Sequence, residues 1–399
     1  MFSHKNILLG VTGGIAAYKS CEIIRQIKKN HGNVRVVMTP TAKKFIAPLT
    51  LATLSENPVL MDMFADEFGG STIHIEAARW ADVILLCPAT ANTIGKISSG
   101  ISDNLLTTLI MAATVPVIFC PAMNKEMYRN AVFVENVAKL KKAGYSFVDA
   151  DAGDLACGEV GEGRLAGIDS ILFSVKKELF GEDVLAGKKI LITAGRTEED
   201  LDPVRFLTNR SSGKMGFALA EAAAIAGAEV TLISGPTQLP AFSGGKFIRV
   251  RSAAEMAKAV EKEFSVNDAV IMAAAVADFK PEKKSLQKLK KSEDDLTLHL
   301  TRTKDILQWL GQRKGDRCLV GFALETENEL ENAREKMQRK NLNLIVVNNP
   351  TTSGAGFDHD TNLVTIIDQD GNEEMLPLMS KFEVARAIIA RVAHCFVNN

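Results

Sequence analysis

The chain has 399 residues, of which 46% are hydrophobic, and a formal net charge of −1. That length exceeds what one ordinary hydrophobic core serves, so we expect a globular protein of two domains. Acidic and basic side chains nearly cancel, which argues against nucleic acid as the main partner. No apolar run approaches the ~20 residues of a membrane span, so we expect no membrane association.

Two further features bear on localisation. A strand-like apolar run begins by residue 6, so we expect no signal peptide before it. The six cysteines are scattered and form no CxxC pair, which argues against a disulfide scaffold and against a zinc ribbon. The sequence therefore predicts a protein of the reducing cytoplasm.

The first half of the chain alternates short apolar runs with helical segments, which is typical of a parallel α/β sheet. The runs at residues 6–11, 34–38, 83–87 and 115–120 predict strands. Their Val, Ile and Leu residues are consecutive, as expected for strands covered on both faces. Residues 16–29, 43–55 and 104–112 predict helices.

A second series of the same kind begins at residue 188. Its predicted strands lie at residues 189–193, 229–234, 269–274, 318–323 and 344–347, with a long helix at residues 214–226. Between the two series, the glycines and charges of residues 180–187 indicate a linker. The sequence thus predicts two α/β domains with separate sheets, at residues 1–187 and 188–399.

The turn after the first predicted strand, at residues 11–19, combines small residues with the start of a helix. Free backbone N–H groups at such a turn can hold a phosphate. The GxGxxG spacing of dinucleotide-binding proteins is absent, and a plain tight turn explains the glycines equally well. Two polar loops, at residues 87–93 and 120–127, also follow predicted strands, at the edge where open α/β sheets bind ligands.

These loops carry a resemblance. Residues 12–16 read TGGIA, 88–92 PATAN, 121–124 PAMN and 156–158 ACG. In this order the stretches resemble the homo-oligomeric flavin-containing cysteine decarboxylases, over almost all of the first half. The resemblance implies a flavodoxin-like or Rossmann-like domain that binds FMN and decarboxylates 4'-phosphopantothenoylcysteine. FMN would oxidise the cysteinyl thiol to a thioaldehyde, which then accepts the electrons that CO2 leaves behind.

The decarboxylase resemblance also implies roles for single residues. His74 would assist thiol oxidation and decarboxylation, Asn124 would bind the substrate carboxylate, and Cys157 would donate the final proton. From the residues alone, a hydrogen-bonded histidine at the core edge and an asparagine in an Asx-turn remain open. Cys157 lies in a stretch rich in glycine and acidic residues, which is typical of a mobile lid. The candidates around the flavin are Gly14, Thr39, Asn92 and Asp103.

In the second half, the polar run Asn-Arg-Ser-Ser-Gly at residues 209–213 leads into the predicted helix. Such a run favours both a helix start and an anion site. Residues 273–277 end a predicted strand with small side chains, which lets a ligand approach the backbone. From about residue 188 nearly to the C-terminus, these stretches resemble the phosphopantothenate–cysteine ligase family, which implies a Rossmann-like domain. Dinucleotide binding is the alternative for such a sheet, but its glycine fingerprint is missing.

The ligase resemblance implies that CTP activates the carboxylate of 4'-phosphopantothenate as an acyl cytidylate, which the amine of cysteine attacks. Mg²⁺ and cationic side chains would surround the triphosphate, although the metal ligands are not predicted. Lys288 would contact the phosphates and Asn209 would hold the acyl intermediate; a solvated basic loop is the alternative for Lys288. The implied nucleotide-binding residues are Met272, Ala273, Ala274, Asp278, Lys288, Lys304, Asp305, Ile306, Leu307, Phe322, Lys336 and Lys340.

The sequence departs from the ligase pattern at three places. Residues 195–200 read GRTEED where the family usually reads GPTREP. Lys304 stands where a proline is usual, and Asn343 stands where an aspartate is usual. These changes bear on loop shape and on the ligase rate more than on the fold.

Together the two resemblances imply a bifunctional enzyme of coenzyme A biosynthesis. They also imply a homo-oligomer: FMN sites between the subunits of trimers, trimers joined into a dodecamer, and ligase domains paired as dimers. Two other classes of protein have less support from the sequence. A dehydrogenase with two Rossmann-like domains would need NAD fingerprints that are absent. A flavoprotein-fold regulatory subunit without chemistry would not need His74, Asn124 and Cys157 together.

Overall fold

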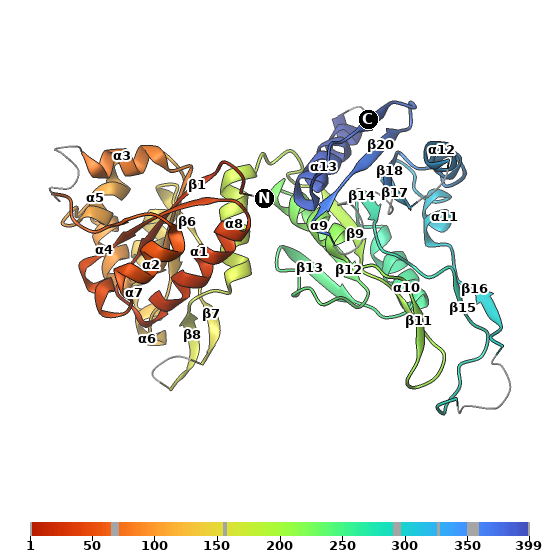
Figure 1. The fold of residues 1–399 in the computed structure, drawn as a ribbon, viewed down its shortest axis with the longest axis horizontal. Helices are drawn as coiled ribbons and strands as arrows, with labels where there is room; N and C mark the ends of the chain where they lie inside the picture. Colours follow the sequence, from red (N-terminus) through yellow and green to blue (C-terminus); the bar gives the residue numbers. More distant parts are fainter. Residues whose placement is uncertain are drawn as a thin grey trace. The chain divides into compact units, whose positions relative to one another are not determined.

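The computed structural model describes residues 2–64, 72–154, 158–289, 297–324, 328–348 and 359–397. Its contacts divide the chain into two α/β units, residues 1–180 and 181–399 (Figure 1). The division follows helix α8 (Ile168–Phe180), whereas the sequence-predicted boundary lies a little further along the chain. Within the described ranges, no helix is both long enough and apolar enough to cross a membrane.

Unit 1 is built on a six-stranded parallel sheet in the order β3-β2-β1-β4-β5-β6. The chain runs outward from β1 to β3 and then returns to place β4 on the other side of β1. The point between β1 and β4 is therefore a topological switch point. The strands are β1 (Asn6–Val11), β2 (Asn33–Met38), β3 (Val59–Leu60), β4 (Val83–Ala89), β5 (Val117–Pro121) and β6 (Ser146–Phe147).

Helices cover both faces of this sheet. One core cluster joins the sheet to α1 (Ser20–Lys29), α2 (Pro48–Ser55) and α8. The other joins it to α3 (Ile73–Trp80), α4 (Ala91–Ser98), α5 (Leu105–Met111) and α7 (Ala131–Lys142). Leu9 of β1 belongs to the first cluster and Leu8 to the second, so consecutive apolar residues are needed. This confirms the predicted strands covered on both faces.

Two prolines move element boundaries away from the prediction. The helix predicted at residues 43–55 begins only at Pro48, because the residue before a proline avoids the helical region. Ala47 accordingly has extended backbone, with φ −70° and ψ 133°. The strand predicted from residue 115 begins at Val117, after Pro116, which has no N–H to donate to a sheet.

Near the end of unit 1, the glycine-rich stretch forms an antiparallel hairpin of β7 (Asp151–Asp154) and β8 (Val160–Arg164). Most of its residues are exposed, which agrees with a stretch outside the core. The short helix α6 (Lys125–Arg129) contacts β8. Cys157, in the connection between β7 and β8, lies outside the described residues.

Unit 2 contains an eight-stranded sheet in the order β13-β12-β9-β14-β17-β18-β20-β21. Its first six strands are parallel and repeat the strand order of unit 1, while β20 and β21 are antiparallel additions. The strands are β9 (Lys189–Ala194), β12 (Glu229–Ser234), β13 (Gly245–Arg249), β14 (Ala269–Met272), β17 (Cys318–Leu324), β18 (Leu344–Asn348), β20 (Val364–Asp368) and β21 (Glu373–Met375).

The helices of unit 2 are α9 (Lys214–Ile225), α10 (Ala253–Phe264), α11 (Ile306–Gly311), α12 (Glu329–Arg339) and α13 (Lys381–Val397). Helix α9 packs against β9 and α13. A Cβ on Gly216 would lie 2.5 Å from the Cβ of Ala194, so glycine is required for this close approach. Three short antiparallel pairs complete the unit: β10 (Glu198–Asp200) with β11 (Phe206–Thr208), β15 (Phe279–Pro281) with β16 (Leu300–Arg302), and β19 (Thr361–Asn362) with β22 (Met379–Ser380).

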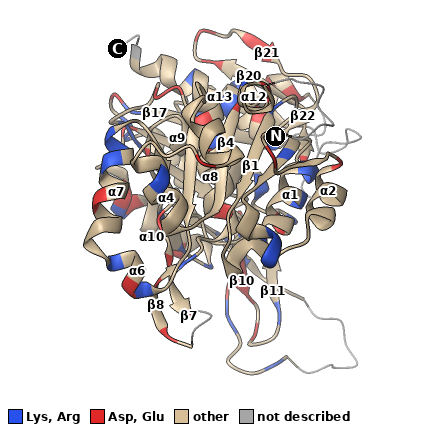
Figure 2. Ribbon diagram, turned by 90° about the vertical axis from the view of Figure 1, so that its left-hand side faces the viewer, with Lys and Arg blue, Asp and Glu red and all other residues tan. Residues whose placement is uncertain are grey.

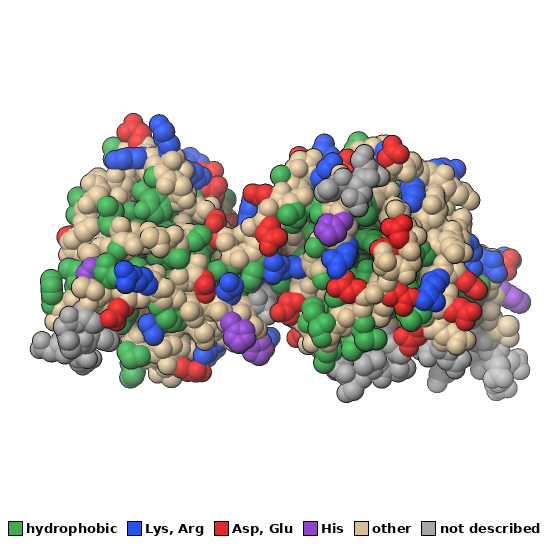
Figure 3. Space-filling model, turned by 90° about the horizontal axis from the view of Figure 1, so that it is seen from above, with side chains coloured by type: hydrophobic (Ala, Val, Ile, Leu, Met, Phe, Trp, Pro, Cys, Tyr) green, Lys and Arg blue, Asp and Glu red, His purple; other side chains and the backbone are tan. Residues whose placement is uncertain are grey.

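Charge is kept out of the central strands. Figure 2 shows β1 and β4 without Lys, Arg, Asp or Glu, while the helices around them carry both signs. On the face seen in Figure 3, hydrophobic, acidic and basic side chains are interspersed. This distribution is that of an ordinary globular surface.

Candidate active sites

The carboxyl edge of the unit 1 sheet holds a cavity of about 950 Å³. Its walls come from the segments after β1, β2, β4 and β5, together with β8. This is the edge, and the switch point, at which open α/β sheets bind ligands. Three of the sequence-predicted residues line it: Gly14, Asn92 and Asn124.

The segments after β1 and β4 are fastened to each other beneath this cavity. The Thr12 hydroxyl donates to the Pro88 carbonyl at 2.7 Å and accepts from the Thr90 N–H at 3.0 Å. A Cβ on Gly13 would lie 2.6 Å from Thr41 Oγ1, so the segment after β2 approaches the backbone closely. Gly13 and Gly14, which were predicted to form a phosphate-binding turn, therefore lie between the cavity and the segment after β2.

Basic and apolar side chains share the wall. Lys19, Lys44 and Arg164 line the cavity, with Asp154 as an acidic neighbour. Burial, and next the charge of Arg164, lower the pKa of Lys19. Apolar side chains of the wall include those of Ile15, Phe45, Met123 and Met127. The cavity can therefore accept a ligand with both a flat apolar body and an anionic group.

Asn124 caps helix α6 at one side of the cavity. Its Oδ1 accepts the Glu126 N–H at 2.8 Å, and its Nδ2 donates to Glu159 Oε2 at 3.1 Å. The adjoining Met123 N–H donates to the Gly163 carbonyl at 2.9 Å. A Cβ on Gly163, which has φ +123°, would lie 2.3 Å from the Met123 carbonyl oxygen. The hairpin therefore sits directly on the loop that carries Asn124.

The other predicted residues of unit 1 lie elsewhere. Thr39 is buried, and its Oγ1 lies 3.3 Å from the hydroxyl of Thr41, which does line the cavity. Asp103 is paired with Lys96 at 2.5 Å, and neither residue belongs to the described lining. The Lys96 hydrogen bond lowers the pKa of Asp103.

His74 lies at the start of α3, from which no described residue of the cavity wall comes. Its Nδ1 is buried and has no hydrogen-bond partner within the described ranges. Trp80, at the end of the same helix, packs against the core, with Arg35 4.5 Å from the centre of its ring.

Sequence reasoning missed several wall residues, among them Ile15, Lys19, Thr41, Phe45 and Arg164. A signal for two of them existed. β2 is the parallel neighbour of β1, so the segments after both strands meet at one edge. The Thr39 N–H indeed donates to the Val11 carbonyl at 3.1 Å, which places residues 39–45 beside the glycine turn.

In unit 2, the predicted residues gather at the corresponding edge of the sheet. The Ala275 N–H donates to the Gly195 carbonyl at 2.8 Å, which joins the segments after β14 and β9. Asn209 Nδ2 donates to the Ala275 carbonyl at 3.1 Å. The predicted small residues Ala273 and Ala274 are half-buried here, as a ligand-facing backbone requires. Met272, the last residue of β14, is buried instead.

Lys288 is exposed, but its loop is held on both sides. The Ser285 N–H donates to the Leu201 carbonyl at 2.9 Å. The Leu289 N–H donates to Asp202 Oδ2 at 3.1 Å, and the Leu289 carbonyl accepts from Arg205 Nη2 at 2.7 Å. The predicted basic loop is thus anchored to the segment 201–205.

Asp202 is the centre of this anchor. Its carboxylate is buried and accepts from Arg205 Nε and Nη2 at 2.9 and 2.7 Å. Burial raises the pKa of Asp202, but hydrogen bonds from backbone N–H groups and from Arg205 outweigh burial and hold this pKa well below its usual range. The carboxylate therefore stays ionised while it fixes the loop.

A second group of predicted residues surrounds the start of α11. Asp305 caps this helix through the Gln308 N–H at 2.8 Å and forms an ion pair with Lys340. Burial raises the pKa of Asp305, but hydrogen bonding, first of all from Lys340, outweighs burial, so the pKa is lowered. Lys336, one turn before Lys340 on α12, donates to the Phe322 carbonyl at 2.8 Å. The two lysines therefore share one face of α12, as their spacing predicts.

The remaining predicted residues lie around this group. Ile306 is buried in the core and Leu307 packs at its margin, so both hold α11 in place. Lys304 pairs with Glu261 on α10. Asp278 is exposed, and its carbonyl accepts the Thr303 N–H at 2.9 Å.

The acidic side chains of the altered loop at residues 195–200 are paired with cations. Glu198 and Asp200 pair with Arg251 at 3.2 and 3.0 Å, and Asp200 also pairs with Lys284 at 2.5 Å. The Lys284 hydrogen bond lowers the pKa of Asp200. The acidic residues of this loop are therefore neutralised by cations on neighbouring segments.

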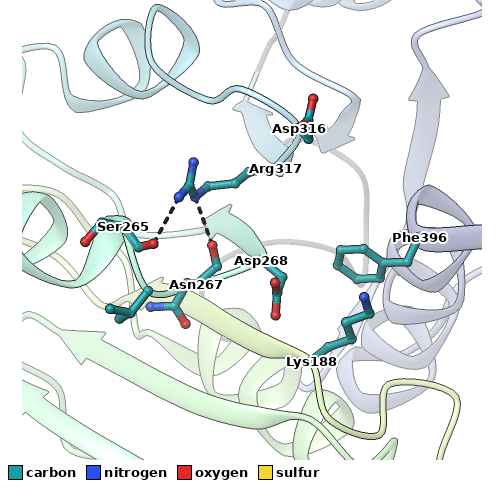
Figure 4. A pocket seen from close by; sticks show the side chains of 8 residues that line it. Lys188, Ser265, Asn267, Asp268, Asp316, Arg317 and Phe396 are labelled. Carbon is teal, nitrogen blue, oxygen red and sulfur yellow. Dashed lines mark hydrogen bonds between the residues drawn. The ribbon is translucent and has the colours of Figure 1, made fainter. Parts of the chain in front are cut away.

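A smaller cavity of about 450 Å³ lies at the opposite, amino edge of the unit 2 sheet (Figure 4). Arg317 donates there to the Asn267 and Ser265 carbonyls at 3.0 Å each, and Lys188 lies 4.7 Å from the centre of the Phe396 ring. Its most basic group is thus engaged with backbone. None of the predicted ligase residues lines this cavity.

Within the described ranges, no three His, Cys, Asp or Glu side chains come together to hold a metal ion. A metal that enters with a nucleotide takes many of its ligands from phosphate and water.

Comparison with known proteins decides the family. A flavoprotein model matches residues 1–180, and a model of the DNA/pantothenate metabolism flavoprotein C-terminal domain matches residues 185–396. The coenzyme A biosynthesis bifunctional protein CoaBC of Bacillus subtilis (strain 168) is 47% identical over 397 residues, 98% of each chain. The chain belongs to the family of bifunctional coenzyme A biosynthesis proteins. Both resemblances read from the sequence are confirmed.

Other proteins of this family are similar to the whole chain or to its second half. The bifunctional protein of Vibrio cholerae serotype O1 is 45% identical over 388 residues, 96% of this chain and 97% of its own. A crystal structure of the C-terminal domain of such a protein is 43% identical, with a TM-score of 0.48, and covers 55% of this chain and 100% of its own. As a family member, the chain is a phosphopantothenoylcysteine decarboxylase and a phosphopantothenate–cysteine ligase, which decides against the dehydrogenase and the regulatory subunit.

Proposed function

We propose that unit 1 binds FMN in the 950 Å³ cavity and decarboxylates 4'-phosphopantothenoylcysteine there. The single observation that carries this assignment is the cavity at the switch point, with glycines at one wall and cations beside them. The flavoprotein match over the same residues supports a flavin. When bound, FMN would supply the reversible oxidation of the substrate thiol.

The residues present fit such a group. Gly13 and Gly14 line the cavity at the turn after β1, and the lack of a side chain at Gly13 lets the Thr41 segment approach, because a Cβ there would meet Thr41 Oγ1. Lys19, Lys44 and Arg164 offset anionic charge in the same wall. We propose that Gly14, Thr39 and Asn92 support the cofactor, Thr39 acting through Thr41.

Asn124 is proposed to bind the substrate carboxylate. Its Oδ1 is engaged by the Glu126 N–H, so Nδ2, which donates to Glu159 in this structure, is the group that would meet a carboxylate. Cys157 is proposed as the proton donor to the product, a role that comes from the family motif alone.

We further propose that the active unit 1 is a homo-oligomer, a trimer within a dodecamer, with ligase units paired as dimers. Ile15, Tyr18 and Phe45 line the cavity yet are 62%, 60% and 45% exposed. Apolar side chains of this kind at a cavity mouth are typical of an interface. His74 and Asp103, which lie outside the described wall, could reach a cavity from a neighbouring subunit.

For unit 2, we propose that CTP with Mg²⁺ activates 4'-phosphopantothenate before cysteine attacks. Lys288 and the Lys336–Lys340 face supply cations at the carboxyl edge of the sheet, and Phe322 lies against Lys336. Asn209 is proposed to hold the acyl group through its carboxamide. Loss of pyrophosphate would build charge beside these lysines, where fixed cations stabilise it most.

One experiment tests both halves. The purified chain is incubated with 4'-phosphopantothenate, cysteine, CTP and Mg²⁺, and the products are identified by mass spectrometry beside a visible spectrum of the protein. We expect a flavin spectrum, phosphopantothenoylcysteine as intermediate and phosphopantetheine as product. A colourless protein would refute the assignment of unit 1, and activity with ATP but not CTP would refute that of unit 2.

A further inference from the structure

Beside the cavity of unit 1, a carboxylate of the chain itself is bound to Asn124, the residue proposed to bind the substrate carboxylate. Asn124 Nδ2 donates to Glu159 Oε2 at 3.1 Å, and Lys125 Nζ lies 3.8 Å from the same oxygen. Because Asn124 Oδ1 accepts the Glu126 N–H, the carboxamide cannot turn over without losing that bond. The Nδ2 group is thereby kept as a donor for an anion.

The β7–β8 hairpin places Glu159 beside Asn124, although the two residues are 35 positions apart in the sequence. The Met123–Gly163 hydrogen bond fixes β8 on the Asn124 loop, whereas the exposed ion pair of Arg129 with Glu162, at 3.3 Å, adds little. No side chain fits at Gly163, which has φ +123° and the Met123 carbonyl against it. The hairpin is therefore shaped to place the chain just before β8 beside Asn124.

We propose that Asn124 Nδ2 and Lys125 Nζ form a carboxylate subsite, and that Glu159 occupies it until the substrate carboxylate displaces it. Glu159 is then an internal competitor that sets how strongly the enzyme selects a substrate bearing a carboxylate over the decarboxylated product. The inference rests on the proposed role of Asn124. It assigns to Glu159 a role in specificity and not in the chemical step.

The physical basis is that one carboxylate replaces another at the same hydrogen-bond donor. A carboxylate that leaves water to bind Asn124 must replace another carboxylate already bound there, so only the difference between the two contributes to affinity. The Glu159 side chain is 44% exposed, so releasing it into water is easy and the competition is modest. Removing it should therefore strengthen binding of a carboxylate ligand about two- to tenfold, the range of one hydrogen bond.

The test uses two compounds that differ only in the carboxylate. 4'-Phosphopantothenoylalanine keeps the carboxylate but has no thiol, so it does not turn over, and 4'-phosphopantothenoylethylamide lacks both groups. Their dissociation constants are measured by titrating the flavin spectrum of the full chain. We expect Glu159→Ala to bind the alanine compound about two- to tenfold more tightly and the ethylamide unchanged.

The matched control is Glu162→Gln, a change on the same hairpin at a residue that pairs with Arg129 and not with Asn124. It should change neither constant. If Glu159→Ala tightened both compounds equally, a looser hairpin would explain the result and the proposal would be wrong. Unchanged or weaker binding of the alanine compound would also overturn it.

A double-mutant cycle separates this inference from the proposed function on which it rests. In an Asn124→Ala background, Glu159→Ala should no longer alter the ratio of the two dissociation constants. A remaining effect would contradict the competition. If Asn124→Ala alone left that ratio at its parent value, Asn124 would not bind the carboxylate, and the role proposed for it would fail together with the inference.

Discussion

The carboxyl edges of the two sheets show what a shared strand order does and does not determine. Both units run outward from their first strand, return across it, and so place loops around a switch point. In unit 1 those loops enclose one cavity of about 950 Å³ with apolar walls. In unit 2 the charged side chains of this edge are instead paired with one another, as in Asp202–Arg205 and Asp305–Lys340.

This difference matches the two proposed chemistries. A flavin is a flat, largely apolar group that needs a preformed slot, whereas a nucleoside triphosphate with Mg²⁺ is a hydrated polyanion that needs cations at fixed positions. Topology decides where the ligand binds, and the loops decide which ligand it is. Changes in either edge should therefore affect one activity and spare the other.

The largest effect is expected from Lys288→Gln in unit 2. Removing this positive charge should slow pyrophosphate release about a hundredfold, the usual consequence of losing one contact to developing transition-state charge. Decarboxylation of added phosphopantothenoylcysteine should continue at the parent rate. The matched control is Lys283→Gln, an exposed lysine of the same loop, which should leave both rates unchanged. Equal rates for Lys288→Gln and the control would make Lys288 a solvated surface residue.

The reciprocal test in unit 1 is Gly163→Ala. The added methyl group would lie 2.3 Å from the Met123 carbonyl in a backbone with φ +123°, so the hairpin must move away from Asn124. A displacement of this kind should lower kcat/KM for decarboxylation at least about tenfold, from local strain of a few kcal/mol. Ligation should be unaffected. Gly144→Ala is the control, because it has φ +92° but no neighbour within 4 Å. A variant as active as this control would show that the hairpin contact is dispensable.

Asp202→Asn tests the anchor of the Lys288 loop. Loss of its charge weakens the Arg205 pair and the bond to the Leu289 N–H, so ligation should fall about tenfold. The exposed Glu282→Gln, near the same loop, serves as control and should keep the parent rate. A parent rate for Asp202→Asn would mean that the loop is held by its backbone contacts alone.

The same carboxylate predicts a pH dependence. Its folded pKa is lowered, so its contribution to stability is present above the pKa of an unfolded aspartate, about 3.9, and is lost as the pH falls through the folded value. The difference in urea midpoint between parent and Asp202→Asn should therefore stay constant from about pH 7 to 5 and shrink below about 4. A difference that grew on acidification would have the wrong sign.

A region could be predicted from the sequence where its structure depends on a local pattern of residues. Strands such as β1 and β12 were predicted with their bounds, because consecutive apolar residues on a doubly covered strand are a local signal. The short β3 and β6 were missed, since two residues paired at a sheet edge carry no pattern of their own. The site residues followed mainly from family motifs.

The pairing of side chains far apart in the chain could not be predicted from the sequence. Nothing local indicates that Asp202 would hold the loop 87 residues later, or that Glu159 would reach Asn124. Such contacts depend on how loops from different strands meet at one edge. The lysines 336 and 340 are the exception, because helical periodicity alone places them on one face.

The smallest effects should separate the two lysine–carboxylate pairs of unit 2. The Lys340 side chain is 9% exposed and its partner Asp305 caps α11, so Lys340→Met leaves a carboxylate without its cation at a helix start. We expect the KM for CTP to rise about fivefold. The Lys304 pair with Glu261 is about half exposed and screened by water, so Lys304→Met should change that KM less than about twofold. Thermal unfolding of both variants is the check on folding, and decarboxylation is the check on unit 1. If the two variants raised KM equally, burial of the pair would not matter, and CTP would contact both lysines directly through their charges.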